Sequence, residues 1–127
     1  MLKGLHHVAI ICSNFERSKR FYTHVLGLKI IKETYRAARG SFKLDLALGD
    51  TYIIELFSFP NPPVRISRPE ACGLRHIAFA VENMDEEIQR LQQHGVQLEA
   101  VRFDELTGKR FTFFSDPDDL PIELYEI

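Results

Sequence analysis

The stretch LHHVAI, residues 5–10, returns with small changes as LRHIAF at residues 74–79. Each copy reads as a β-strand, and aligning the copies pairs His7 with His76. Because side chains alternate between the two faces of a strand, the adjacent histidines of the first copy point to opposite faces. The second copy has Arg75 in place of the first of them. We therefore tie His7, and not its neighbour, to the repeat.

A second landmark repeats farther along the chain, as IIELF at 53–57 and PIELY at 121–125. This alignment pairs Glu55 with Glu123. From the histidine to the glutamate there are 48 residues in the first half and 47 in the second. Two halves with such closely matched spacing indicate one duplicated structural module.

Both halves have the same predicted order of elements, a strand, a helix and three further strands, so the sequence predicts an α+β fold of tandem βαβββ modules. Ser13 or Asn14 is expected to cap the first helix, which Gly27 ends. Asn83 and Gly95 have the same roles in the second half. The later strands are short and apolar, at 28–35, 42–48 and 51–57 in the first half and at 97–103, 110–115 and 121–126 in the second.

The chain of 127 residues, 45% hydrophobic and 27% charged, has the composition of one soluble globular domain. We expect a single domain made of a first module at 1–60 and a second at 73–127. The Pro-rich residues 61–72 are the predicted linker. Cys12 and Cys72 are too few for a disulfide framework, so both are expected to be free thiols, with Cys12 in the core.

The charge and hydropathy of the chain exclude several classes of partner. A net charge of −2 provides no basic surface for nucleic acid or for an anionic membrane. No apolar run approaches the roughly 20 residues that span a bilayer, and the first residues lack the apolar core of a signal peptide. We therefore expect a cytoplasmic protein.

The paired His and Glu residues are the candidate functional residues of the sequence. Glu55 and Glu123 lie within mostly apolar strands, where an ionised carboxylate is costly unless it is paired or binds a metal. A lone His or Glu on a strand is usually solvated or satisfied by a neighbour, but the matched positions favour a shared site. Two imidazoles and two carboxylates suit a divalent first-row metal ion with open positions for water or substrate. The other histidines, His6, His24 and His94, are interpreted as ordinary polar residues.

These residues resemble the vicinal oxygen chelate superfamily, and specifically its metal-dependent glyoxalase I branch, the lactoylglutathione lyases. The resemblance covers the whole chain, including SKRFYTHVLGL at 18–28, similar to the family's first helix, and FFSDPDDLPIEL at 113–124, similar to its final hairpin. It implies the glyoxalase/bleomycin resistance/extradiol dioxygenase fold, in which the tandem modules form a curved mixed sheet. It also implies that one divalent metal ion (Ni, Zn, Co, Mn or Fe) is bound by His7, Glu55, His76 and Glu123.

The resemblance further implies a lyase or isomerase that transfers a proton on a metal-chelated α-hydroxycarbonyl or hemithioacetal, with Glu123 as the catalytic base and a homodimer as the working form. Glu55 as a fourth ligand favours glyoxalase I, because the related dioxygenases and fosfomycin-resistance transferases use three ligands. Two alternatives stay open, a metal-free small-molecule (drug) binding protein and an Fe(II) ring-cleaving dioxygenase of the same superfamily.

Three positions differ from the family pattern. Ile11 and Phe59 stand where the glutathione-binding forms carry an arginine and an asparagine, which implies a smaller or less anionic substrate. Asp119 replaces a hairpin glycine, a mild change because aspartate tolerates the left-handed conformation. Cations that can compensate from loops or strand ends are Arg36, Arg39, Lys43, Arg65, Arg68 and Arg110.

Overall fold

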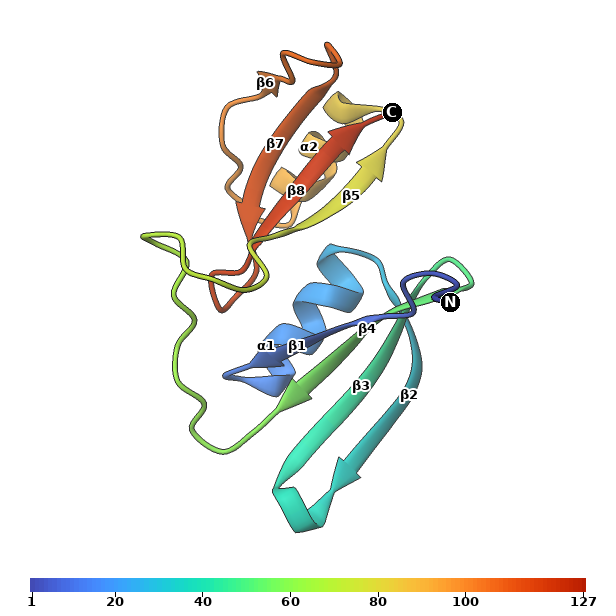
Figure 1. Cartoon of the computed structure of the whole chain (residues 1–127), viewed down its shortest axis with the longest axis vertical. Helices are drawn as coiled ribbons and strands as arrows, with labels where there is room; N and C mark the ends of the chain where they lie inside the picture. The colour runs from blue at the N-terminus through green and yellow to red at the C-terminus, as the bar shows by residue number, and fades with distance from the viewer. The chain divides into compact units, whose positions relative to one another are not determined.

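The structure is a computed structural model that describes residues 1–127, and it divides into two compact units, Met1–Val64 (unit 1) and Arg65–Ile127 (unit 2). Each unit has one four-stranded mixed sheet and the element order βαβββ (Figure 1). The structure therefore confirms the α+β class, with one sheet in each unit. Residues 65–72, which the sequence assigns to the linker, belong to unit 2.

The sheet of unit 1 has the strand order β1-β4-β3-β2, in which β1 runs parallel to β4 and the other neighbours are antiparallel. In Figure 1 the blue strand β1 lies beside the green strand β4, although the sequence separates them widely. The elements are β1 (Val8–Cys12), α1 (Phe15–Arg20), the π-helical η1 (Phe21–Val25), β2 (Lys29–Arg36), the 3-10 turn η2 (Ala37–Arg39), β3 (Ser41–Leu48) and β4 (Thr51–Ser58).

Helix α1 begins where the sequence predicts. Of the two candidate caps, Asn14 is the one that caps, because its Oδ1 accepts a hydrogen bond of 3.1 Å from the backbone N–H of Arg17. The chain leaves the helical region at Gly27, whose φ of 80° is accessible to glycine at little cost. One face of the sheet forms the core with the helical segment, through the fully buried side chains of Tyr22, Leu44, Leu46, Ile54 and Leu56.

Unit 2 repeats this plan with the strand order β5-β8-β7-β6, and β5 runs parallel to β8. The Oδ1 of Asn83 accepts a hydrogen bond of 3.2 Å from the N–H of Glu86 and begins the helix. The core contains the buried side chains of Met84, Leu91, Ile122 and Leu124. The elements are β5 (Ile77–Val81), α2 (Met84–Gln93), β6 (Arg102–Phe103), β7 (Arg110–Ser115) and β8 (Pro121–Glu126).

The strand predicted at 97–103 is wrong in extent, since only Arg102–Phe103 forms a strand. The preceding residues are attached to β7 at one point. The N–H of Glu99 donates to the carbonyl of Phe113 at 2.9 Å, and the hydroxyl of Thr112 donates to the carbonyl of Glu99 at 2.7 Å. The hydroxyl of Thr112 thus occupies the carbonyl of Glu99, which a backbone N–H would bond in a regular β-ladder. The regular ladder therefore does not form here.

The hairpin between β7 and β8 adopts the conformation expected from its sequence. Asp119 has a φ of 66°, in the left-handed region, as the exchange of glycine for aspartate predicts. The buried Asp116 holds the turn, because its Oδ1 accepts from the N–H groups of Asp118 at 2.8 Å and of Leu120 at 2.9 Å. This turn fixes where β8 begins.

The structure also describes the two cysteines and the lengths of the helices. Cys12 is buried and Cys72 is exposed, and both are free thiols, as predicted. No helix in the structure has the length and apolar character needed to cross a bilayer.

Candidate functional site

His7 and Glu55 meet on the face of the unit 1 sheet that lies opposite the core. His7 directly precedes β1, and the parallel register of β1 with β4 places Ala9 beside Glu55. The Nε2 of His7 lies 3.4 Å from the Oε2 of Glu55, whose side chain is 14% exposed. The small alanine leaves room for the imidazole next to the carboxylate.

His76 and Glu123 meet in the same way in unit 2. His76 directly precedes β5, and the parallel register of β5 with β8 places Ala78 beside Glu123. The Nε2 of His76 lies 3.0 Å from the Oε2 of Glu123, whose side chain is 13% exposed. The repeat in the sequence is therefore also a repeat of His–Glu pairs in space, one pair in each unit.

Polar side chains surround Glu55. Asp45 is its cross-strand partner on β3. The hydroxyl of Tyr52 donates to the Oε2 of Glu55 at 2.5 Å and to the Oδ1 of Asp45 at 3.2 Å. The Nζ of Lys43 lies 3.0 Å from that Oδ1 and 3.5 Å from the Oε2 of Glu55. Glu55 is thus held by an ammonium group and a phenol as well as by His7.

Tyr52 and Lys43 are protonated at neutral pH, and these contacts move the pKa of each still farther above neutrality. Burial, and then the hydrogen bond to Glu55, raise the pKa of Tyr52 well above its usual value. The hydrogen bond to Asp45, aided by the nearby charge of Glu55, raises the pKa of Lys43 against an opposing effect of burial. Both side chains therefore remain hydrogen-bond donors to the two carboxylates.

The surroundings of Glu123 are aromatic where those of Glu55 are polar. Phe113 is the cross-strand partner of Glu123, so it takes the place that Asp45 has in unit 1. The ring of His76 packs edge-on against Phe113, with centroids 5.1 Å apart. His76 supplies the polar contact to Glu123, and no phenol or ammonium is bonded to this carboxylate.

The residue before each histidine contacts its ring. The Nδ1 atoms of His6 and His7 are 2.8 Å apart, and the Nη1 of Arg75 lies 3.2 Å from the Nδ1 of His76. Such a partner fixes the orientation of an imidazole and selects which nitrogen carries the proton. The sequence interpretation missed this role of His6, although the aligned positions 6 and 75 were the available signal.

A groove of about 500 Å³ lies beside Glu123, a volume typical of sites for small molecules. Tyr125, two residues after Glu123 on the same strand, lines it. The Tyr125 hydroxyl donates to the Oδ2 of Asp104 at 2.9 Å and shares a hydrogen bond with the Oγ1 of Thr107. The loop that joins β6 to β7 is thereby tied to the strand that carries Glu123.

The donor atoms of each pair fit a divalent metal ion. Two ligands that share an ion at the usual 2.0–2.2 Å lie about 3.0 Å apart at a right angle and about 3.4 Å apart at a tetrahedral angle. The two Nε2–Oε2 separations, 3.4 Å and 3.0 Å, agree with this requirement. In the described structure no group of three or more His, Cys, Asp and Glu side chains is arranged to hold a metal ion.

Comparison with known proteins identifies relatives along the whole chain. A sequence model of the glyoxalase/bleomycin resistance protein/dioxygenase superfamily matches residues 4–124. The YwkD protein of Bacillus subtilis (strain 168) is 61% identical, with 99% of this chain and 98% of that protein covered. The YaeR protein of Escherichia coli (strain K12) is 57% identical, with 98% and 97% covered. A crystal structure of a glyoxalase family protein from Enterococcus faecalis is 47% identical, with a TM-score of 0.91 and 98% of each chain covered.

More distant relatives have varied chemistry. The metallothiol transferase FosB of Staphylococcus haemolyticus is 26% identical over 98% of this chain and 84% of that protein. The putative ring-cleaving dioxygenase MhqE of Bacillus subtilis is 27% identical over 98% of this chain, which spans 41% of that protein. The fosfomycin resistance protein FosX of Listeria monocytogenes, solved with Mn(II), shares the fold at 20% identity, with a TM-score of 0.77 and 98% and 93% covered.

Proposed function

This chain belongs to the glyoxalase/bleomycin resistance protein/dioxygenase superfamily, and on this basis we propose that it is a metal-dependent lyase or isomerase of the glyoxalase I type. Its substrate is a small molecule with two neighbouring oxygens, an α-hydroxycarbonyl or a hemithioacetal. The observation that carries the proposal is the repeated His–Glu pair, one in each unit, with metal-compatible separations between donor atoms.

In this proposal His7, Glu55, His76 and Glu123 bind one divalent ion of Ni, Zn, Co, Mn or Fe. Each pair supplies two ligands, and protein sites for these ions use three or four, so one pair alone is insufficient. The Mn(II) in the FosX structure supports a metal in this fold. When bound, such an ion supplies a Lewis acid that polarises a substrate oxygen and acidifies the neighbouring C–H.

Different surroundings assign different roles to the two glutamates. Glu55 accepts from Tyr52 and lies near Lys43, so its carboxylate is fixed and suits a permanent ligand. Glu123 faces Phe113 and has few polar restraints, so it is free to shift toward a substrate. Two carboxylates in contrasting environments commonly divide the acid–base work in this way. We assign to Glu123 the removal of the substrate proton and its return to the adjacent carbon.

Elemental analysis of the purified protein tests this proposal. We expect about one divalent metal ion for each complete set of four ligands. Isomerase chemistry predicts Ni, Zn, Co or Mn, and also predicts exchange of the substrate C–H with solvent deuterium. Protein that contains no metal after purification, and takes up none from Ni, Zn, Co or Mn solutions, would exclude the proposed enzyme.

The same measurement separates the two alternative functions. A metal-free protein that binds small aromatic molecules would be a binding module of the superfamily. A protein that contains Fe(II) and consumes oxygen with catechols would be a ring-cleaving dioxygenase, as the similarity to MhqE allows. Glu55 argues against the dioxygenase, because its position beside His7 supplies a fourth ligand.

We expect glutathione hemithioacetals to be poor substrates. Ile11 is exposed on the face that carries His7, and the ring of Phe59 stacks on that of Phe57 at 5.8 Å. Neither side chain has a hydrogen-bond donor or a charge, so neither can bind a carboxylate. A charged hydrogen bond is worth about 1.5–3 kcal/mol, and loss of two lowers kcat/KM by several powers of ten. A steady-state assay with methylglyoxal and glutathione, beside the same assay with other thiols, measures this. A kcat/KM above about 10⁵ M⁻¹s⁻¹ for the glutathione adduct would overturn the expectation.

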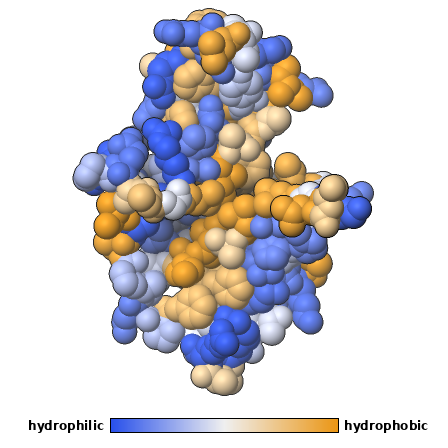
Figure 2. Space-filling model, viewed as in Figure 1, coloured by the Kyte–Doolittle hydropathy of each residue, from blue (hydrophilic) through white to orange (hydrophobic).

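We also propose that the chain works as a homodimer. Strand β2 is an edge of the unit 1 sheet, and Ile30, Ile31 and Tyr35 on it are 47%, 55% and 57% exposed. Apolar surface is visible elsewhere on the molecule as well (Figure 2). Open strand edges and exposed apolar side chains favour association. Light scattering of the metal-loaded protein is expected to give twice the mass of the chain, and a monomer that retains its metal would contradict the dimer.

A further inference from the structure

We propose that three arginines of unit 2, Arg68, Arg75 and Arg102, form a pocket that binds the acid group of a small-molecule ligand, a carboxylate or a phosphoryl group. This arginine pocket encloses about 90 Å³. A water molecule needs about 10–15 Å³ by the same measure, so one small anionic group fits. As a statement about substrate, the inference rests on the proposed function and adds an acid group to the substrate class.

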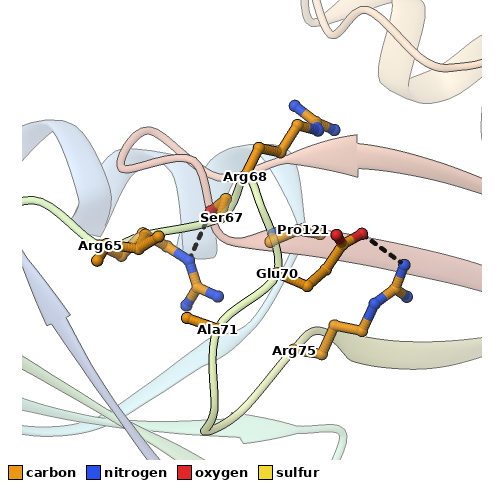
Figure 3. A pocket seen from close by; sticks show the side chains of 8 residues that line it. Arg65, Ser67, Arg68, Glu70, Ala71, Arg75 and Pro121 are labelled. Carbon is orange, nitrogen blue, oxygen red and sulfur yellow. Dashed lines mark hydrogen bonds and ion pairs between the residues drawn. The ribbon is translucent and has the colours of Figure 1, made fainter.

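Glu99 also lines the pocket, so one carboxylate lies there against three guanidinium groups and the charge of the pocket stays positive. Arg102 pairs with Glu99 at 3.1 Å, and Arg75 with Glu70 at the longer distance of 3.5 Å. Arg68 makes no ion pair, and in Figure 3 its side chain extends away from Glu70 while a dashed line joins Glu70 to Arg75. Exposed pairs of this kind contribute little, so an incoming anion displaces them at small cost.

The segment that carries two of these arginines is held in place from within. The Nε of Arg65 donates to the Oγ of Ser67 at 2.7 Å (Figure 3). The Nη2 of Arg65 donates to the carbonyl of Leu74 at 3.1 Å. The hydroxyl of Ser67 donates in turn to the carbonyl of Asp119 at 2.6 Å. These bonds fasten residues 65–75 to the β7–β8 turn, so the pocket is preorganised for its ligand.

Arg102 connects the arginine pocket with the groove beside Glu123. Its guanidinium carbon lies 5.0 Å from the ring centroid of Phe111 and 5.6 Å from that of Phe113, so it rests on an aromatic floor. Stacking of this kind leaves the edge of the guanidinium open to hydrogen bonding. Its Nη2 donates to Glu99 at 3.1 Å here, and an anion binds by taking over this contact. Arg102 lines both cavities. A ligand anchored here by its acid group therefore directs its remaining atoms toward Glu123.

This placement refines the substrate expected from the sequence. The changes at Ile11 and Phe59 imply a ligand smaller than a glutathione adduct, and the arginine pocket adds one acid group to it. A glutathione adduct carries two carboxylates that need two separate contacts. The single arginine pocket cannot supply both. The inferred substrate class is a compact hydroxycarbonyl acid or phosphate ester.

Binding of inorganic phosphate and of malonate to the full chain, freed of metal with a chelator, tests the pocket. We expect saturable binding with a Kd of about 1 mM or below, followed by calorimetry and by NMR of the arginine Nε–H groups. Tighter binding of phosphate indicates a phosphoryl group, and tighter binding of malonate indicates a carboxylate. Absence of saturable binding of both anions would overturn the inference.

Variants that each lose one positive charge, at different positions, distinguish a specific anion site from nonspecific electrostatic attraction. Arg75→Gln and Arg102→Gln are expected to weaken anion binding at least tenfold, and Arg102→Lys to weaken it less. The control is Arg90→Gln, whose guanidinium is bonded to Glu87 on α2, and it is expected to change binding less than twofold. An equal loss in the control would overturn the inference. Because no metal is present, failure of the proposed enzyme leaves these results unchanged.

Discussion

The His76→Ala variant is expected to bind its divalent metal more than about 100-fold more weakly than the unsubstituted protein. Even the loss of an outer partner of a ligand costs 10–100-fold, and here a ligand itself is removed. The neighbours offer no substitute, because Ala78 and Phe113 carry no donor atom and Arg75 is a cation. Elemental analysis after dialysis against a fixed concentration of free metal measures the loss.

The matched control is His94→Ala, in which an exposed histidine at the end of α2 is removed. It is expected to leave the metal content unchanged. His7→Ala should lose metal as His76→Ala does, because the proposal treats the two His–Glu pairs as equivalent ligands. Full metal occupancy in the His76→Ala variant would remove this residue from the proposed ligand set.

The two pairs could be predicted from the sequence because they depend on the most regular part of the fold. A histidine just before the first strand of a module and a glutamate within its last strand are brought together by a parallel register that both units repeat. The period of two along a strand then fixes the face that each glutamate takes. It does not apply to His6, which lies before β1 and whose ring contacts those of His7 and Tyr52 instead of pointing to the opposite face. One alignment of the two halves therefore suggested both contacts.

The unequal surroundings of the two glutamates depend on features that the alignment does not contain. Asp45 and Lys43 reach Glu55 only through the antiparallel register of β3 with β4, which shifts at an irregularity between Leu46 and Ala47. The hydrophobic pattern fixes the face that a residue takes, but the turn that joins two antiparallel strands and any irregularity in them set which residues stand opposite each other. Lys43 was accordingly expected at a strand end, whereas it lies within β3.

The arginine pocket is even harder to predict from sequence patterns than the surroundings of the two glutamates. Of its three arginines, the sequence pointed only to Arg68 as a cation able to reach the cavity, and it did so as one of several; Arg75 was noted only as the counterpart of His6. Arg75 and Arg102 are brought to it by a loop without periodicity and by a two-residue strand. Such segments take their shape from individual hydrogen bonds, here those of Arg65, and no composition or spacing rule gives these in advance.

The Glu123→Gln variant is expected to slow proton transfer by about 10²–10⁴-fold while keeping much of its metal. The amide oxygen remains a possible ligand, but the amide has no basic site that can accept a proton at neutral pH. The measurement is the exchange of substrate C–H with solvent deuterium, followed by NMR with hydroxyacetone and with methylglyoxal hemithioacetals of several thiols. Glu82→Gln, the same change at an exposed position, is the control and should leave the rate unchanged.

A comparison with Glu55→Gln decides which carboxylate is the base. Glu55 is fixed by Tyr52 and Lys43, so its substitution should lower metal affinity more than it lowers proton transfer in the metal-loaded protein. Glu123, beside Phe113, should show the opposite balance, with metal content largely kept and exchange lost. Exchange that survives Glu123→Gln and disappears in metal-loaded Glu55→Gln would reverse the two roles. The contrast between a polar and an aromatic environment would then not explain the division of work between the two glutamates.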